Sequence, residues 1–530
     1  MKTRKFILAV AAGITAVASG CSSDLLNVEQ LTAPTSDFLY NSPEGLQKAI
    51  IGLYDKDRDF VGNQSSGGDL YIIDHLDYCT DIMVYRGGTA ATFARLNNFK
   101  TTTGQFNTYW KNYYSIIGKA NEIIAAAQRI GLDKEGVAQP YGEACLFRAK
   151  SYLKLWQRFE RIYLNTEPTT VENAFGRTFR PASRNEIFTQ IKSDLDEAIS
   201  NLEWKYEESG RLNKAVAKHV RAQLAMWEED WDTVISECDD IITGEGAAYF
   251  GFEANAIDVF QGADYTSKEV LYAFQFSANP GGGNVISGGL PKGHTLSLNV
   301  TPRYDKLSGM VHASEYGGYG WGRIYPNTHL LSLYDKAKDR RYSDFFAQGW
   351  IANDKEKPNY GTPVTWTTSQ YIECAHFYNV KHMDKWTNQD LPNRNSSFRD
   401  VLVYRLAETA LMAAEACVHN GDNTNALRFF NMTYQRALGE PFAGTVTMQD
   451  ILDETARECN FEGVRWPQLK RLGLLEEYVT KWAGDSKADD PNLNANLIEP
   501  RQNFKNYMIC WAIPQAQLDL MPGYGQNPGW

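Results

Sequence analysis

The chain has 530 residues, of which 43% are apolar, 13% aromatic and 22% charged. This is the composition of a folded globular protein, and it excludes a disordered chain. The formal net charge of −11 argues against a nucleic-acid partner, because proteins that bind phosphate backbones present a basic surface. A high aromatic content with a mildly acidic surface instead suits neutral, hydroxyl-rich ligands, since sugar rings pack against Trp and Tyr.

The N-terminus carries the pattern of a lipoprotein signal peptide. A basic start precedes an apolar run from Phe6 to Val17, and small residues lead to Cys21. A run of about a dozen apolar residues is too short to cross a hydrocarbon core, which needs about 20. We expect residues 1–20 to be removed, Cys21 to be lipidated, and 21–40 to form the lipidated N-terminus and tether.

Helical periodicity dominates residues 41–243, which we predict to be an N-terminal helical part. Apolar side chains recur at three- and four-residue steps, as one buried stripe requires. Ser183 with Glu186 forms the pattern of a capping box at the start of one helix. Helices are predicted at 109–124, 141–159, 183–202, 214–227 and 231–242.

Residues 244–400 lack the helical periodicity of the preceding part and are rich in glycine. Glycines punctuate short apolar runs such as Val270 to Phe274, which predicts a large loop-rich insertion carrying short strands and helices. Long loops on a helical frame are where binding residues usually lie. We therefore expect the ligand-binding region in this insertion.

Residues 401–530 are predicted to form a C-terminal helical part. Val401 to Val418 reads as one helix, and Asn425 to Ala437 follows it after a short turn. Short-looped antiparallel helices with small residues at their crossings are how tetratricopeptide-type repeats stack. The predicted fold class is mainly α: a tetratricopeptide-like scaffold of about four helical pairs that carries the loop-rich insertion.

Aromatic and polar side chains on glycine-rich loops are the best candidates for a ligand site. They gather in the segments 81–95 and 315–325. Glycine cannot bury a ring locally, so we expect several rings to face solvent, where they stack on sugars while guanidinium groups bind hydroxyls. The alternative for each ring is a place in the core under a loop. The candidates are Tyr85, Arg86, Arg95, Tyr316, Tyr319, Trp321, Arg323 and Trp366.

Catalytic and metal-binding signatures are missing from the sequence. It contains no His-Glu-x-x-His, no phosphate loop and no Gly-x-Ser-x-Gly, so we expect no catalytic residue, no metal and no cofactor. The sequence has eight cysteines and no C-x-x-C pair. Apart from Cys21, the other seven are predicted to be mostly buried thiols, although a disulfide stays open.

Three acids, Glu454, Glu458 and Glu462, recur four residues apart. A glycosidase needs two carboxylates on opposite sides of one bond. Because Arg457 and Arg465 are interleaved with these acids, we instead predict a structural ion-pair network in which the carboxyl pKa values are lowered.

Nearly the whole chain resembles the SusD/RagB-like outer-membrane nutrient-binding lipoproteins. The likeness lies in the order and spacing of several segments beside the lipoprotein start. They are NSPEGLQKAIIGLY, YWKNYYSIIGKANEII, GEACLFRAKSYLKLW, SRNEIFTQIKSDLDEAISNL, DVLVYRLAETALMAAEA, ECNFEGVRWPQLKRLG and the ending IPQAQLDLMPGYGQNPGW.

The resemblance implies a lipid-anchored protein at the outer cell surface, in the outer membrane, without catalytic activity. It implies an oligosaccharide ligand and a SusC-like TonB-dependent transporter as partner, over which the protein closes as a lid. Two alternatives stay open beside it. One is a surface glycoside hydrolase that uses Glu458 and a second acid, and the other is a tetratricopeptide adaptor that binds peptide or protein.

Overall fold

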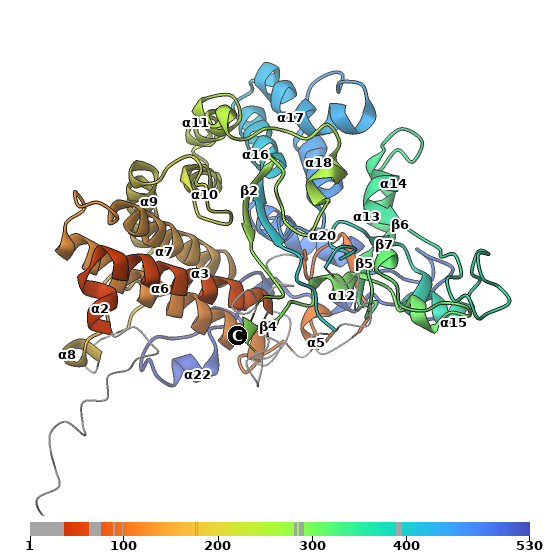
Figure 1. The fold of residues 1–530 in the computed structure, drawn as a ribbon, viewed down its shortest axis with the longest axis horizontal. Helices are drawn as coiled ribbons and strands as arrows, with labels where there is room; N and C mark the ends of the chain where they lie inside the picture. The colour runs from red at the N-terminus through yellow and green to blue at the C-terminus, as the bar shows by residue number, and fades with distance from the viewer. Residues whose placement is uncertain are drawn as a thin grey trace, which may run out of the picture.

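The computed structural model describes residues 36–62, 76–87, 91–97, 99–174, 176, 179–279, 284–285, 291–387 and 395–530. The predicted signal peptide, Cys21 and most of the tether lie outside these residues. Among the helices that are described, none combines the length and the apolar character needed to span a membrane. Figure 1 shows helices on one side of the molecule and loop-rich chain on the other.

The N-terminal helices form one packed layer (Figure 1). Helix α6 packs against α7, α7 against α9, and α10 against α11. The predicted capping box of Ser183 and Glu186 is present at the start of α9. The helices are α2 (Ser36–Asn41), α3 (Pro43–Gly62), α6 (Gly104–Ile130), α7 (Ala138–Phe159), α9 (Arg184–Asn201), α10 (Lys214–Glu228) and α11 (Trp231–Ile242).

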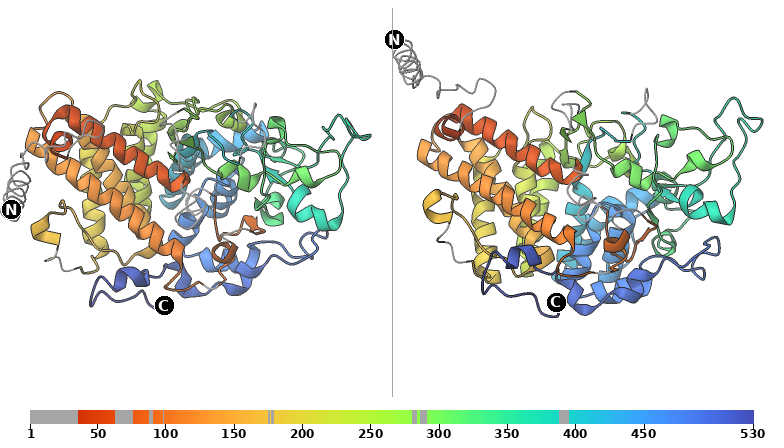
Figure 2. Two further views of the ribbon diagram at one scale, coloured as in Figure 1. Left: turned by 60° about the horizontal axis from the view of Figure 1, so that its bottom comes forward. Right: turned by 90° about the horizontal axis from the view of Figure 1, so that it is seen from below.

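The C-terminal helices continue this layer. Helix α16 packs against α11, α17 and α18, so that pairs far apart in sequence stack on one another. Figure 2 shows the helical side and the loop-rich side of the molecule from two further directions. The prediction of a mainly helical fold is confirmed. These helices are α16 (Leu406–His419), α17 (Asn423–Leu438), α18 (Met448–Cys459), α19 (Arg465–Arg471) and α20 (Leu475–Trp482).

The predicted helix from Val401 to Val418 is wrong in its first turn. Strand β8 (Val401–Arg405) pairs antiparallel with β2 (Val270–Phe274), and α16 begins only at Leu406. The backbone N–H of Leu406 donates to the carbonyl of Glu269 at 2.9 Å. Valine and tyrosine in this stretch favour a strand once a partner strand is available, which local periodicity does not report.

The loop-rich part contains short strands and helices at the right of Figure 1. Strand β1 (Met83–Tyr85) joins it by pairing antiparallel with β5 (Ile324–Pro326), which brings the segment 81–87 beside residues far along the chain. The other strands are β3 (Asn284–Val285) paired with β4 (Pro291–Lys292), and β6 (Phe346–Ala347) paired with β7 (Tyr378–Asn379).

Short helices complete the described chain. In the loop-rich part they are α12 (Leu296–Val300), α13 (Thr328–Ser332), α14 (Arg341–Phe345), α15 (Thr368–Gln370) and a π-helical turn at Tyr371–Ala375, and elsewhere α5 (Ala91–Ala94), α8 (Val171–Ala174), α21 (Glu499–Asn503) and α22 (Gln515–Leu518). Single 3₁₀ turns lie at Glu245–Ala248, Ala256–Phe260, Tyr304–Lys306, Ser314–Tyr316 and Asn506–Ile509.

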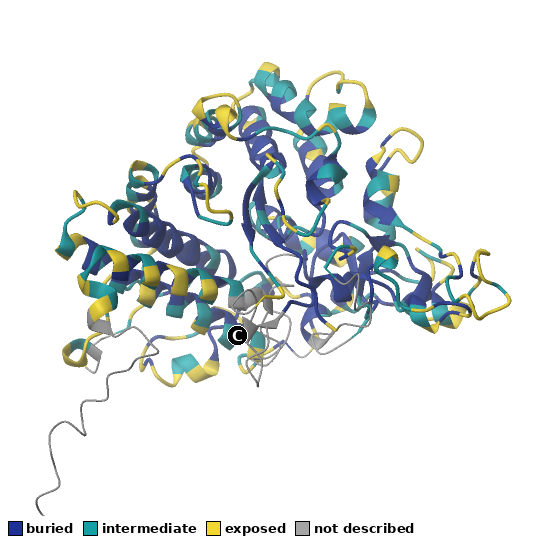
Figure 3. Cartoon of the chain, in the orientation of Figure 1, coloured by how far each residue is buried: buried dark blue, intermediate teal, exposed yellow. Residues whose placement is uncertain are grey.

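The core runs through both halves of the molecule, as the buried residues in Figure 3 show. One large apolar cluster joins the N-terminal helices to the loop-rich part and to the C-terminal segment. The seven cysteines that the structure describes are free thiols, and all but Cys510 are buried. The prediction of mostly buried thiols is thus confirmed for these seven, since a buried thiol packs as a small hydrophobe.

Candidate functional site

The candidate site is built on the glycine-rich loop 317–323. The backbone N–H groups of Trp321, Gly322 and Arg323 donate to carbonyls of residues 298–301 at 2.7, 2.8 and 3.0 Å. A side chain at Gly320 would place its Cβ 2.4 Å from two backbone carbonyl oxygens, so only glycine permits this close approach. The loop is therefore tied along its length to the end of α12.

Two aromatic rings of this loop are half-buried and stand beside charged side chains. The guanidinium of Arg323 lies 3.9 Å from the centre of the Trp321 ring and covers one of its faces. The ring of Tyr319 lies 5.1 Å from that of His312, and the Arg303 guanidinium is 5.7 Å from its centre. Trp321 and Tyr319 thus each lie beside a cationic side chain, and their role as ligand contacts stays a prediction.

Tyr316 has a more structural role than Tyr319 or Trp321. Its hydroxyl donates to the carbonyl of Ile351 at 3.1 Å, and its ring packs edge-on against Trp350 at 5.2 Å. These contacts fasten the loop to the segment that follows β6. Although Tyr316 lies close to Tyr319 in the sequence, its own ring and hydroxyl therefore contact the protein.

Arg86 reaches the same loop from β1. Its Nε donates to the carbonyl of Gly322 at 2.6 Å, and its Nη2 donates to the carbonyl of Trp321 at 2.9 Å. The guanidinium also lies 3.6 Å from the Glu373 carboxylate. Burial lowers its pKa from the ordinary arginine value. Arg86 thus holds the loop in place, and its Nε and Nη2 both donate to the protein backbone.

Tyr85 and Arg95 occupy structural positions. Tyr85 is 6% exposed, and its ring packs 5.2 Å from that of Tyr78, so the expectation that this ring faces solvent is not met. The reason is the pairing of β1 with β5, which turns the Tyr85 side chain into the core. Arg95 donates to the carbonyls of Tyr85 and Arg86 and pairs with Glu499 at 3.2 Å.

Trp366 lies in the segment that precedes α15. Its half-buried ring packs against an apolar cluster that includes Tyr325 and Tyr371. The contacts that fix Trp321 come instead from residues 298–301, Arg323 and Arg86. Trp366 therefore belongs to a neighbouring cluster and stays a prediction as a ligand contact.

Sequence reasoning missed the charged residues around the rings. Arg303 donates to both carboxylate oxygens of Asp305 at 3.1 and 3.2 Å, and His312 lies 3.6 Å from the same carboxylate. Burial raises the Asp305 pKa, but hydrogen bonds from His312 and Arg303 outweigh it, and the pKa falls to about 2. Lys306 pairs with Glu373 at 2.8 Å. The spacing of Arg303 and Asp305 was the only feature of the local sequence that could have indicated these charged residues. Glu373 is far away in the sequence and comes close to Lys306 only in the folded structure.

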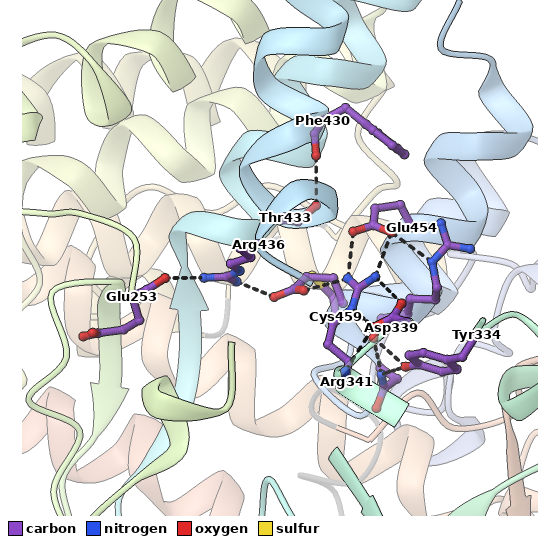
Figure 4. Close-up of polar contacts among 12 residues, drawn as sticks. Glu253, Tyr334, Asp339, Arg341, Phe430, Thr433, Arg436, Glu454 and Cys459 are labelled. Carbon is purple, nitrogen blue, oxygen red and sulfur yellow. Dashed lines mark hydrogen bonds and ion pairs between the residues drawn. The ribbon is translucent and has the colours of Figure 1, made fainter. Parts of the chain in front are cut away.

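The predicted ion network of the three glutamates is present and buried (Figure 4). Glu454 and Glu458 lie on α18, and Glu462 follows the end of that helix. Glu458 contacts Arg341 and Arg405 at 2.8 Å and Arg436 at 2.5 Å, and its side chain is 0% exposed. Burial acts to raise its pKa, but the three guanidinium groups hold that pKa well below its usual range. A carboxyl that is ionised and shut off from solvent cannot protonate a glycosidic oxygen, so the hydrolase alternative that uses Glu458 is wrong.

The helical scaffold thus carries half-exposed rings beside charged side chains. Residues 242–530 match the model of the SusD family, so the chain belongs to this family. Residues 27–225 match a second model, described as starch-binding and associating with the outer membrane. The SusD-family glycan-binding proteins are non-catalytic, and the prediction that this chain is not an enzyme is confirmed on that ground.

Known relatives cover most of the chain. SusD-like protein P25 of Formosa agariphila is 23% identical over 93% of this chain and 92% of its own. A SusD homolog from Bacteroides thetaiotaomicron has the same fold, with a TM-score of 0.73 at 17% identity over 94% of this chain and 99% of that one. Surface glycan-binding protein A of the same organism, solved in complex with laminarihexaose, gives a TM-score of 0.69 at 17% identity, over 91% and 99%.

Proposed function

We propose that this protein is a non-catalytic, cell-surface glycan-binding subunit of a SusC-like, TonB-dependent import complex. One observation carries the proposal: Tyr319 and Trp321 are half-exposed on one loop, and Arg303, which is paired with Asp305, lies 5.7 Å from the centre of the Tyr319 ring. Family membership and the glycan-binding names of similar structures support it. Lipid on Cys21 holds the protein in the outer membrane, where it closes over the transporter as a lid.

Binding uses stacking and hydrogen bonds together. A sugar ring packs on the face of Trp321 that Arg323 does not cover, because the apolar C–H face of a pyranose matches the aromatic surface. The Arg303 guanidinium donates to hydroxyl oxygens and the Asp305 carboxylate accepts from hydroxyl groups. Such charge-assisted hydrogen bonds are stronger than neutral ones. Their mutual pairing keeps both groups in place before the glycan arrives.

The test is calorimetric titration of the chain that starts after Cys21 with a panel of neutral oligosaccharides, laminarihexaose among them. Trp321→Ala should weaken binding of the best ligand by about tenfold or more, through loss of stacking and buried area. Tyr249→Ala is the matched control, because Tyr249 is 40% exposed on a different element and its loss should leave the affinity unchanged. Circular dichroism verifies that both variants fold.

Two results would overturn the proposal. One is a wild-type protein that binds no glycan in the panel or that releases new reducing ends. The other is a folded Trp321→Ala variant with wild-type affinity. Binding of peptides in place of glycans in the same titrations would favour the adaptor alternative.

The membrane and transporter roles have separate tests. Cys21→Ser should abolish incorporation of labelled fatty acid and release the protein from the outer membrane, because a single acylated cysteine provides the anchor. Purification of the lipidated protein from outer membranes under mild detergent should recover a TonB-dependent transporter with it. Recovery of the protein alone in repeated preparations would contradict the partner assignment.

A further inference from the structure

Apart from the proposed glycan-binding surface, the helical scaffold contains a cavity. It has a volume of about 100 Å³ and is lined by residues from α7, α10, α16, α18 and α19 and from the strands β2 and β8. None of its described lining residues belongs to the aromatic loop or to the Arg303–Asp305 pair. The cavity is therefore distinct from the proposed glycan surface.

Much of the cavity wall is apolar. Met226 and Trp227 contribute from α10, Leu411 and Met412 from α16, and Pro467 from α19. Methionine side chains adapt to irregular shapes, and a tryptophan offers a large flat contact. This wall suits the apolar body of a small molecule.

One polar side chain that lines the cavity makes no hydrogen bond to the described part of the protein. Gln157 on α7 is 4% exposed, and its backbone carbonyl accepts from Lys470 at 2.9 Å. Within the described part of the chain, its side-chain amide makes no hydrogen bond, although it lines the cavity. The Gln157 amide is therefore available to a polar group of a ligand in the cavity, where a few polar side chains fix the orientation of a bound molecule.

Lys154 stands one turn before Gln157 on the same face of α7 and also lines the cavity. Its ammonium forms no ion pair within 4.0 Å among the residues that the structure describes. The other lysine of the cavity, Lys150, is paired with Asp57, and Arg471 is paired with Glu415 at 2.6 Å. Lys154 is thus the cation on this wall that lacks a direct partner in the described chain.

An ionised acid faces this cation from α16. Glu408 accepts a hydrogen bond from the Gln223 Nε2 at 2.7 Å, and its second oxygen lies 3.3 Å from His219. Burial alone would raise its pKa, but His219, Gln223 and the charge of Lys154 together bring the pKa below its usual value. Lys154 and Glu408 therefore attract each other across the cavity without meeting.

We propose that this cavity binds a free α-amino acid with an apolar side chain, in its zwitterionic form. The ligand carboxylate accepts hydrogen bonds from the Lys154 ammonium and the Gln157 amide. The ligand ammonium donates to the Glu408 carboxylate. The ligand side chain packs against Met226, Trp227 and Met412. A zwitterion matches the opposed charges of the two walls, whereas a plain acid or amine would satisfy one wall and be repelled by the other.

The experiment is calorimetric titration of the wild-type chain with L-phenylalanine and L-leucine, together with the thermal unfolding midpoint in millimolar ligand. A ligand that binds only the folded state raises that midpoint. N-acetyl-L-phenylalanine and L-phenylalaninamide each remove one charge, and each should bind at least about tenfold more weakly, because a charged partner is left unpaired. These ligand comparisons need no variant.

Variants then locate the site. Lys154→Met and Glu408→Gln should each weaken L-phenylalanine binding by about tenfold or more. Lys119→Met, which removes an exposed lysine from α6, should leave it unchanged. Trp321→Ala should also leave L-phenylalanine binding unchanged while glycan binding falls. A failure of the amino-acid proposal can therefore be told apart from a failure of the glycan proposal.

Three results would overturn the inference. The first is no heat and no rise of the unfolding midpoint with any apolar amino acid. The second is equal binding of the free and the blocked ligands. The third is wild-type affinity in both folded variants at Lys154 and Glu408.

Discussion

Arg86 and Gly322 are joined by a 2.6 Å hydrogen bond from the arginine Nε to the glycine carbonyl, across 236 positions of the chain. Through this bond a strand near the N-terminus holds the loop that carries the exposed rings in the second half of the protein. The adjacent bond to the Trp321 carbonyl, at 2.9 Å, makes the contact bidentate. A planar guanidinium suits this arrangement, because its donors project in a fixed fork.

Replacing Arg86 by methionine should loosen this loop. The carbonyls of Trp321 and Gly322 would lose their donors, at a cost of about 1–3 kcal/mol in the free energy of unfolding. Glycan affinity should fall severalfold, because Trp321 would no longer be held in its binding position. Urea unfolding and calorimetric titration measure the two effects, and Arg180→Met, which removes a 67% exposed arginine, is the control. Full affinity in a folded Arg86→Met protein would show that the clamp has no role in binding.

Glu458→Gln tests the buried network. The substitution removes the buried negative charge that pairs with Arg341, Arg405 and Arg436. Breaking such a buried ion pair costs about 3–5 kcal/mol. The free energy of unfolding in urea should fall by that amount. Glu477→Gln, at an exposed position on α20, should change it by less than about 0.5 kcal/mol. Equal stability of the two variants would refute the structural role of Glu458.

Asp485 should make stability depend on pH. Its carboxyl is 2% exposed, it accepts hydrogen bonds from Thr328, and burial raises its pKa to about 7. Its unfolded value is about 3.9, so the folded state binds more protons between about pH 4 and pH 7. The stability that protonated Asp485 contributes is therefore fully present below about pH 4 and is lost as the pH rises through about 7.

The Asp485→Asn variant isolates this effect because asparagine still accepts from Thr328 but does not titrate. The free energy of unfolding of wild type relative to the variant should fall by on the order of 2 kcal/mol between pH 5 and pH 8. Urea unfolding at several pH values measures it. Asp133→Asn, at an exposed carboxyl, should show no such trend. A pH-independent difference for Asp485→Asn would mean that this carboxyl is ionised throughout the range.

Local patterns predicted the helices well. The stripe from Tyr109 to Ile124 lies within α6, and the capping box at Ser183 starts α9, because both depend on residues within one or two turns. The α18 acids were also predicted to be structural, since bases interleaved with acids are visible in the chain itself. Val401 to Arg405 was predicted wrongly because its strand partner lies more than a hundred residues away.

The candidate site also has a part that the sequence predicted and a part that it did not. Composition pointed to the loop that carries Tyr319 and Trp321, because glycines beside rings are a local signal. It pointed equally to Tyr85, which the pairing of β1 with β5 turns into the core. Glu373 was not found at all, since its salt bridge to Lys306 depends on how two loops meet.

The sequence by itself predicted a lipoprotein start at Cys21, and it determined the helical stripes and the family resemblance, because each depends on the order and spacing of neighbouring residues. Only the tertiary structure decided which rings reach solvent, which arginines are clamps, and where Lys154 and Glu408 face each other. Exposure and charge pairing depend on contacts between segments far apart in the chain, and hydrophobic periodicity carries no information about those contacts.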